Sequence, residues 1–481
     1  MPGMNDLAVS ASTSPAGGGS HGGVLAGIVL ALMAAAGMAF VHPWLGPVLA
    51  VALGGAVFVV SRPLRGLMLF CVLAPALPWM KVGAPLPVPE ALLALTWVGV
   101  FFQWLGGRLP AWPDGPTERA MRRFMLWSIV PLVAGQFIAE GEGNGPINWV
   151  RWLLNLSPVF LVPLLVRDTR TRDRLLLSLL LGFALLLLIS LGFFVRGRDA
   201  RLMIPFLAAL HYPYPEAIQD IFSADYTRMA SPWVHPNSTG GALLLAAPLG
   251  LFYGVMHRGW RRALGFFIFV GSAAGIVFCG SRGALLCLGL FVVWLAWRRT
   301  PYALRGLIAA VLLAITFLAV YPPAQQRFAS LFSGKDVSTG VRFDEYAHFP
   351  QNAWRHPLGL GFKAETPASS PEKGIYGISN LWLNYWFKLG LPGMLLFIAV
   401  TVAWWREVRL RAPFTQIGAH NAMRIATTGT VLAALATGFI DHYFSFTQVL
   451  IALFWLILAL GLLEARMQPV AAARPDAPPR P

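Results

Sequence analysis

Charged side chains are scarce in this chain. Asp, Glu, Lys and Arg make up only 12% of the 481 residues, whereas 57% are hydrophobic; soluble domains carry about 25% charged residues. This shortage excludes an ordinary soluble domain and indicates an integral membrane protein. At about 20 residues for each spanning helix, the chain is long enough for more than about ten spans, and no separate soluble domain is required.

Cysteine and acidic residues are also few. The three cysteines, Cys71, Cys279 and Cys287, lie in or beside apolar runs at no metal-ligand spacing, and we interpret them as small core residues. The net charge is +16 because 37 basic residues face only 21 acidic ones. In a soluble protein this balance suggests nucleic acid. Here the basic residues lie mainly between apolar runs, where they set topology, so we predict no nucleic-acid partner.

Long apolar runs dominate what is present. The sequence predicts an all-α integral membrane protein, a polytopic bundle of about 12–14 transmembrane helices, with one long periplasmic loop at 322–380. Residues 24–466 form the predicted membrane domain; 1–23 and 467–481 lack apolar content and are predicted to be disordered cytoplasmic tails. The first apolar run lacks the basic flank of a secretory signal, so we expect it to be retained. The runs are 24–41, 44–60, 66–80, 91–106, 124–139, 147–166, 175–195, 239–256, 263–280, 284–297, 303–320, 381–404, 422–440 and 446–463.

Arginine placement sets the expected orientation. With both termini in the cytoplasm, most basic residues fall in short cytoplasmic loops, as the positive-inside rule requires. This orientation does not explain a second set of arginines, which fall on the opposite side. Contact with lipid headgroups accounts for any one of these arginines, but less well for Arg228, Arg282 and Arg342 together. The set is Arg196, Arg198, Arg201, Arg228, Arg282 and Arg342.

Two short motifs contain arginines of this set. Arg228 precedes a Pro-Asn helix start, at which Asn237 or Ser238 is a candidate cap; alternatively, the N–H groups of this helix start and Arg228 hold an anion. Arg282 stands in a glycine-flanked turn between two apolar runs. Its planar fork suits a phosphate group, and a plain interfacial turn is the alternative.

A third group of candidates lies in the long polar stretch and the runs after it. Arg342 shares one side of a predicted helical turn with Tyr346 and Phe349. His348 lies four residues after Asp344, a spacing that suits an oriented base or an ordinary solvated pair. Lys388 falls inside an apolar run, and Asp441 and His442 lie near the end of another; each is a functional candidate or an interfacially solvated group.

Together these motifs resemble the bacterial O-antigen ligase and O-antigen polymerase superfamily. The resemblance covers roughly residues 225–405 at motif level and the whole chain by topology. The matching pieces are the segment from Arg228 to Asn237, the Ser281-Arg282-Gly283 turn, Gly340-x-Arg342 followed by His356-Pro-Leu-Gly-x-Gly361, and Asn380 with Gly390-Leu-x-Gly393.

The resemblance implies a glycosyltransferase of the bacterial inner membrane. Such an enzyme takes a glycan carried on undecaprenyl pyrophosphate at the periplasmic face and transfers it to an acceptor glycan or the lipid A core, among membrane lipids. The family arginines are thought to grip the pyrophosphate, which carries over to Arg282, Arg342 and Arg228. No cofactor or metal is expected, although Asp344, Glu345 and Asp441 leave a metal site open.

The sequence departs from the ligase pattern at one position. Ligases typically carry a His-Asn pair where the helix after the long loop opens, and its histidine is the expected base; here the pair reads Ser379-Asn380. The base therefore stays open among His348, His442 and Asp441. The candidate substrate-binding residues are Asn237, Ser379, Asn380 and Lys388.

Two other classes of function fit a polytopic chain of this size. One is a transporter or flippase for lipid-linked sugars, although no internal repeat is evident and the candidate arginines lie at one rim. The other is a non-catalytic subunit of a polysaccharide-export complex, in which the arginines would be dispensable.

Overall fold

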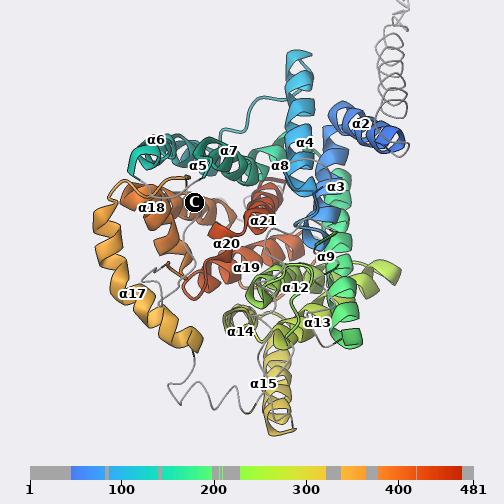
Figure 1. Ribbon diagram of the computed structural model, residues 1–481. Helices are drawn as coiled ribbons and strands as arrows, with labels where there is room; N and C mark the ends of the chain where they lie inside the picture. Colours follow the sequence, from blue (N-terminus) through green and yellow to red (C-terminus); the bar gives the residue numbers. More distant parts are fainter. Residues whose placement is uncertain are drawn as a thin grey trace, which may run out of the picture. The chain divides into compact units, whose positions relative to one another are not determined.

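The computed structural model describes residues 45–81, 86–138, 143–197, 205, 208–209, 228–320, 325, 337–363, 377–418 and 420–467. Within these ranges the chain is helical and contains no strand (Figure 1). The chain divides into two compact units, Met1–Arg62 and Pro63–Pro481. The predicted tail 1–23, the predicted span 24–41, residues 468–481 of the other tail, Arg198 and Arg201 lie outside the described residues.

The predicted apolar runs that fall in the described ranges form helices. The first unit contains α2 (Leu45–Ser61). The second contains α3 (Pro63–Ala76), α4 (Val88–Leu105), α5 (Pro116–Trp127), α6 (Ile129–Ile138), α7 (Gly145–Leu156), α8 (Pro158–Leu165), α9 (Thr169–Gly197), α12 (Pro236–Met256), α13 (Gly259–Cys279), α14 (Arg282–Trp297), α15 (Ala303–Val320), α17 (Val337–Arg355), α18 (Leu381–Val408), α19 (Ala422–Thr437), α20 (Tyr443–Phe446) and α21 (Gln448–Met467).

Several of these helices are long and apolar enough to cross a membrane. Among the described residues six qualify, namely α4, α9, α12, α13, α18 and α21, and up to eight spans result if each of two broken helix pairs is one span. Helices α14 and α19 are apolar but shorter. The prediction of an all-α polytopic membrane protein is thus confirmed. The count of twelve to fourteen spans stays a prediction.

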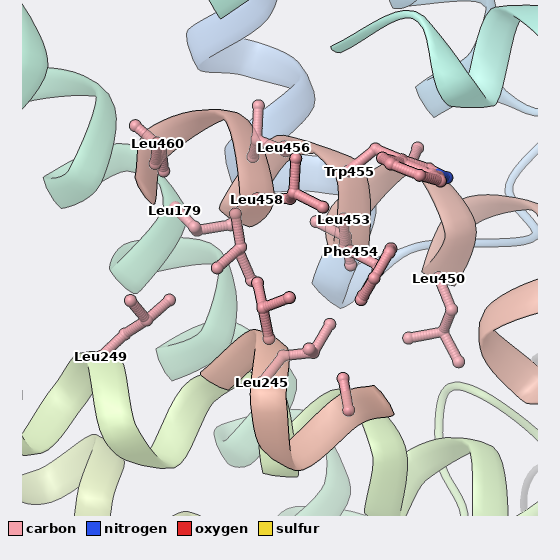
Figure 2. Packing of buried hydrophobic residues seen from close by; sticks show 14 of the residues in the cluster. Leu179, Leu245, Leu249, Leu450, Leu453, Phe454, Trp455, Leu456, Leu458 and Leu460 are labelled. Carbon is pink, nitrogen blue, oxygen red and sulfur yellow. The ribbon is translucent and has the colours of Figure 1, made fainter. Parts of the chain in front are cut away.

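Helix α21 forms the core of the second unit. Its residues from Val449 to Glu464 are all buried, because other helices surround it and an all-round apolar helix is stable only inside a bundle or in lipid. In Figure 2 the leucine and aromatic side chains of α21 project to several sides of the helix, and Leu179 of α9 and Leu245 and Leu249 of α12 lie among its neighbours.

Two of the predicted apolar runs are each divided into two helices at a serine. The run 124–139 breaks at Ser128 into α5 and α6, and 147–166 breaks at Ser157 into α7 and α8, which are bent by 41°. A proline follows each break, and proline has no N–H to donate to the preceding turn. The serine hydroxyls satisfy groups near the breaks: Ser128 Oγ accepts from Trp149 Nε1 at 2.8 Å, and Ser157 Oγ accepts from Trp97 Nε1 at 2.7 Å.

Helix α18 is broken at Gly390, where the backbone turns to φ 71° and ψ 172°. The His356-Pro-Leu-Gly-x-Gly segment fills the break. The N–H groups of Leu360 and Gly361 each donate at 2.9 Å to the carbonyls of Phe387 and Lys388. The carbonyl of Leu389 accepts from Trp127 Nε1 at 2.8 Å. Carbonyls released by the break are thus rebonded, as a helix inside a membrane requires.

Part of the predicted long loop is a helix. Residues 337–355 form α17, which joins the segment that fills the α18 break. The side chain of Phe349 is buried, and its ring packs against Trp386 of α18 with centroids 5.4 Å apart. The polar stretch is therefore anchored to the bundle at both α17 and residues 356–361.

Candidate functional site

One cavity of about 90 Å³ collects all three candidate arginines. Its walls come from the start of α12, the turn between α13 and α14, the first half of α17, and the segment from the end of α19 to α20. It is lined by Arg228, Asn237, Gly280, Ser281, Arg282, Gly283, Arg342, Ile440, Asp441 and Tyr443. Segments that are far apart in the sequence thus meet at one site.

Asn237 bridges two charged groups of this cavity. Nη2 of Arg228 donates to Oδ1 of Asn237 at 3.0 Å, and Nδ2 of Asn237 donates to Oδ2 of Asp441 at 3.1 Å. Arg228 also donates through Nε to the carbonyl of Cys279 at 2.7 Å. The amide therefore couples the Arg228 guanidinium to the Asp441 carboxylate in the one orientation that satisfies both.

The cap of α12 is His235. Its Nδ1 accepts from the backbone N–H of Asn237 at 3.2 Å, and the helix begins at Pro236. The interpretation of Asn237 or Ser238 as the helix cap is wrong, because the helix starts before both residues. Asn237 instead lies in the first turn, where its side chain reaches the cavity.

Arg342 enters the cavity from α17. Its Nη2 lies 3.7 Å from Oδ2 of Asp441, and the two side chains are 29% and 15% exposed. The same face of α17 is held on the bundle by Tyr346, whose hydroxyl donates to the carbonyl of Phe439 at 3.3 Å, and by buried Phe349. The predicted common face of Arg342, Tyr346 and Phe349 is thereby confirmed.

Glycines allow the helices and the turn around Arg282 to pack closely together. Helix α13 ends at Gly280, which has φ 61°, a left-handed value that glycine adopts without strain, and α14 starts at Arg282. A Cβ added at Gly240 would lie 2.7 Å from Cβ of Ser281, and one added at Gly241 would lie 2.3 Å from the Tyr443 ring. A larger residue at Gly240 would push α12 away from this turn, and one at Gly241 would push it away from α20.

The charges at the cavity favour an anion. Three guanidinium groups line it, and Asp441 is the one carboxylate among the described residues of its lining, which leaves an excess of two positive charges. Partial burial strengthens the attraction of these groups for an anion. Arginine forks match the oxygens of phosphate in geometry, so the site suits a phosphate or pyrophosphate group.

His442 follows Asp441 in the chain but does not itself line the cavity. Its Nδ1 lies 3.6 Å from Oδ1 of Asp441, while its backbone N–H donates to that oxygen at 2.8 Å. Nδ1 is buried and has no hydrogen-bond partner in the part of the chain that the structure describes. Burial lowers the pKa of His442 below its usual 6.5, and Arg342 acts in the same direction, against the carboxylates of Asp441 and Glu345. The ring is therefore neutral near pH 7 and able to accept a proton.

Residues 267–398 match the family described as O-antigen ligase. Because of this match we refer to residues 267–398 as the O-antigen ligase segment. The match confirms the resemblance to the O-antigen ligase and polymerase superfamily that the motifs indicate. A comparison with curated proteins finds no match to the chain.

The O-antigen ligase segment supplies only part of the cavity. Arg282 and Arg342 lie inside residues 267–398, whereas Arg228, Asn237 and Asp441 lie outside them. Helix α12 and the residues after α19 therefore complete the site that the segment begins.

Other predicted site residues lie near the cavity without lining it. The backbone N–H of Ser379 donates to Oε2 of Glu345 at 2.8 Å. Asn380 caps α18, since its Oδ1 accepts from the N–H groups of Trp382 and Leu383, while its Nδ2 donates to the Tyr346 hydroxyl at 3.0 Å. These contacts hold α17 against the start of α18. A direct part for Ser379 and Asn380 in substrate binding stays a prediction.

Two further predicted site residues of the O-antigen ligase segment, Lys388 and His348, lie away from the cavity lining. The Nζ of Lys388 lies 4.9 Å from the centroid of the Phe362 ring, at the α18 break. The ring of His348 lies 2.8 Å from the backbone carbonyl of Asp344, so this contact does not involve the Asp344 carboxylate. Neither Lys388 nor His348 lines the cavity.

Sequence reasoning missed Tyr443 and considered Glu345 only as a possible metal ligand. Tyr443 lines the cavity, and Glu345 is 3% exposed and accepts the two hydrogen bonds of Ser379. The signal for Tyr443 was its position directly after Asp441 and His442. For Glu345 no local pattern distinguishes a buried carboxylate from a solvated one. Within the described ranges no three His, Cys, Asp or Glu side chains form a group that could hold a metal ion.

Proposed function

We propose that the protein transfers a glycan from undecaprenyl pyrophosphate to a hydroxyl group of an acceptor sugar, at the periplasmic face of the bacterial inner membrane. The observation that carries the proposal is the convergence of Arg228, Arg282 and Arg342 on one cavity that an O-antigen ligase segment helps to build. In this proposal the three arginines hold the pyrophosphate, and we call them the arginine clamp. Asn237 and Asp441 fix the positions of two of them.

The size of the cavity supports a role in which it binds only the phosphate part of the substrate. Its volume is about 90 Å³, which is small beside the pockets of about 300–1,000 Å³ that enclose whole drug-sized ligands. A phosphate group fits such a space, whereas sugar rings and a lipid tail extend beyond it. The clamp thus holds the leaving group and leaves the anomeric carbon at the mouth of the cavity.

The proposed reaction is a single displacement in which all atoms are accounted for. The acceptor hydroxyl oxygen forms a bond to the anomeric carbon, and the bond from that carbon to the pyrophosphate oxygen breaks with its electron pair. The acceptor proton passes to His442. Undecaprenyl pyrophosphate leaves with one more negative charge, which the arginines stabilise because they are already in place.

His442 is the base that the geometry favours. It lies between the cavity residues Asp441 and Tyr443, and its buried Nδ1 carries a lowered pKa. Asp441 is engaged by Asn237, by the His442 N–H and by Arg342, so it serves as the charge partner of the clamp. Neither histidine lines the cavity itself. His442 is favoured because its N–H is bonded to the cavity carboxylate of Asp441, whereas the ring of His348 contacts the backbone carbonyl of Asp344 on α17.

A turnover assay with purified protein tests the proposed function. The full chain in detergent, supplied with undecaprenyl-pyrophosphate-linked oligosaccharide, is expected to release undecaprenyl pyrophosphate and form a larger glycan without a membrane gradient. One arm offers the same lipid-linked glycan as acceptor and the other offers lipid A core, so a polymerase and a ligase give products in different arms. Absence of product in both arms, from protein that is folded, would sink the proposal and favour a transporter or a scaffold subunit.

Replacing His442 by glutamine is expected to lower kcat by about 10²–10⁴-fold, the usual contribution of a general base. The pH profile supplies a second readout. A base must be neutral to accept a proton, and burial lowers the pKa of His442. The wild-type rate should therefore stay level as pH falls to about 6.5, the ordinary histidine pKa, and decline only below it.

His348→Gln is the matched control for this prediction, because it removes the other histidine candidate, which lies on α17 and does not adjoin Asp441 in the chain. It should keep both the rate and the acidic limb of the profile. If His442→Gln retains the wild-type rate, or if its remaining activity shows the same acidic limb, another group accepts the proton.

A further inference from the structure

A second cavity lies at the other end of α12. Its volume is about 290 Å³, and it opens between the end of α12, the start of α13 and the segment before α19. Because α12 has 21 residues, this cavity is about 30 Å along the helix from the arginine clamp. It is lined by Val255, Met256, His257, Arg258, Arg262, Ile417 and Gly418.

The positive charges at this cavity exceed the negative ones. Asp173 of α9 is already engaged, since it lies 3.2 Å from Nε2 of His257 and accepts from Nη1 of Arg261 at 2.6 Å. Arg258 and Arg262 line the cavity. Within the ranges that the structure describes, neither has a carboxylate within ion-pair distance. Two guanidinium groups therefore face the cavity without an acidic counter-charge from those ranges.

The surroundings of these arginines are apolar. Val255 is 47% exposed and Trp260 is 60% exposed. Arg261 lies over the Trp260 ring and Arg262 over the Phe266 ring, each 5.7 Å from the centroid. An exposed tryptophan beside arginines at the end of a spanning helix is typical of the boundary between water and lipid. An anion that binds here thus meets both cations and an apolar surface.

We propose that this cavity binds the phosphate diester of an anionic membrane phospholipid. Arg258 and Arg262 contact the phosphate oxygens, and the acyl chains lie along the exposed apolar side chains of α12 and α13. Basic pockets between spanning helices bind lipid headgroups of this kind. The site is separate from the arginine clamp and does not depend on glycan transfer.

Lipid titration of the full chain in detergent tests this site. Phosphatidylglycerol is expected to raise Tm and to remain bound in native mass spectrometry. Phosphatidylcholine with the same acyl chains should do neither, because its headgroup has no net charge. Inorganic phosphate at the same concentration should also leave Tm unchanged, since it gains nothing from the apolar surface. An equal shift with phosphatidylcholine or with inorganic phosphate would overturn the proposal.

The double variant Arg258→Gln and Arg262→Gln is expected to weaken phosphatidylglycerol binding by about tenfold or more for each guanidinium removed. The matched control is Arg299→Gln with Arg305→Gln, two exposed arginines outside the cavity that give the same change of net charge. The Tm of each lipid-free variant checks folding, and Arg258→Lys with Arg262→Lys, which keeps both charges, should retain part of the binding. Undiminished binding by the glutamine variant would refute the site.

Discussion

Alanine at Arg282 or at Arg342 is expected to lower the rate of glycan transfer by about 10²–10³-fold, the loss found when one donor to a developing negative charge is removed. Both guanidinium groups line the cavity from different elements, α14 and α17. Each would stabilise the pyrophosphate most strongly as it leaves. The measurement is kcat of the purified variant with lipid-linked oligosaccharide, at matched protein levels and matched Tm.

Lysine at either position should retain only part of the rate. It keeps the positive charge but loses the planar fork that bonds two phosphate oxygens at once. The double alanine variant should lose less than the product of the two single effects, because residues that act as one unit are not additive.

Arg355→Ala is the control for the clamp. Arg355 is exposed at the end of α17, on the same helix as Arg342 and within the same O-antigen ligase segment, but it does not line the cavity. Its variant should keep the wild-type rate. Normal transfer by both Arg282→Ala and Arg342→Ala would remove the basis for the clamp.

Alanine at Gly359 is expected to destabilise the protein by about 3 kcal/mol. Gly359 has φ +84°, and an added Cβ would lie 2.4 Å from the Lys388 carbonyl oxygen and 2.5 Å from the Gly390 nitrogen. A left-handed backbone costs other residues about 1–2 kcal/mol, and overpacking adds about 1–3 kcal/mol. Both clashing atoms are backbone, so no side chain can move aside.

The measurement is thermal unfolding of the purified variant in detergent, with glycan transfer as a second readout. Displacement of residues 356–361 would also disturb the first half of α18, against which α17 packs through Phe349. Gly340→Ala is the matched control, because Gly340 lies within α17 and its added Cβ meets nothing within 4 Å. Its stability should be unchanged or raised by up to about 1 kcal/mol. Equal Tm values for the two variants would show that the α18 break does not need glycine at 359.

The three arginines could be singled out from the sequence because charge is rare in an apolar chain. The expected topology accounts for most of the other basic residues but not for a set of six arginines, of which Arg228, Arg282 and Arg342 also stand in motifs. Their companion Asn237 was harder to interpret. A Pro-Asn helix start favours a cap, and only the placement of His235 at the cap position shows that Asn237 reaches Asp441 instead.

Apolar run length and isolated charge are local properties, so the class of the protein, the approximate positions of most helices and the arginine candidates could be predicted from the sequence. Tertiary structure alone decided which helix ends meet. It placed Asp441 between Asn237 and Arg342, filled the α18 break with residues 356–361 and buried Glu345 beside Ser379. All of these helices are hydrophobic, so hydrophobicity alone does not specify which helices become neighbours. Their packing depends on side-chain shape and on a few polar contacts, which form only in the folded bundle.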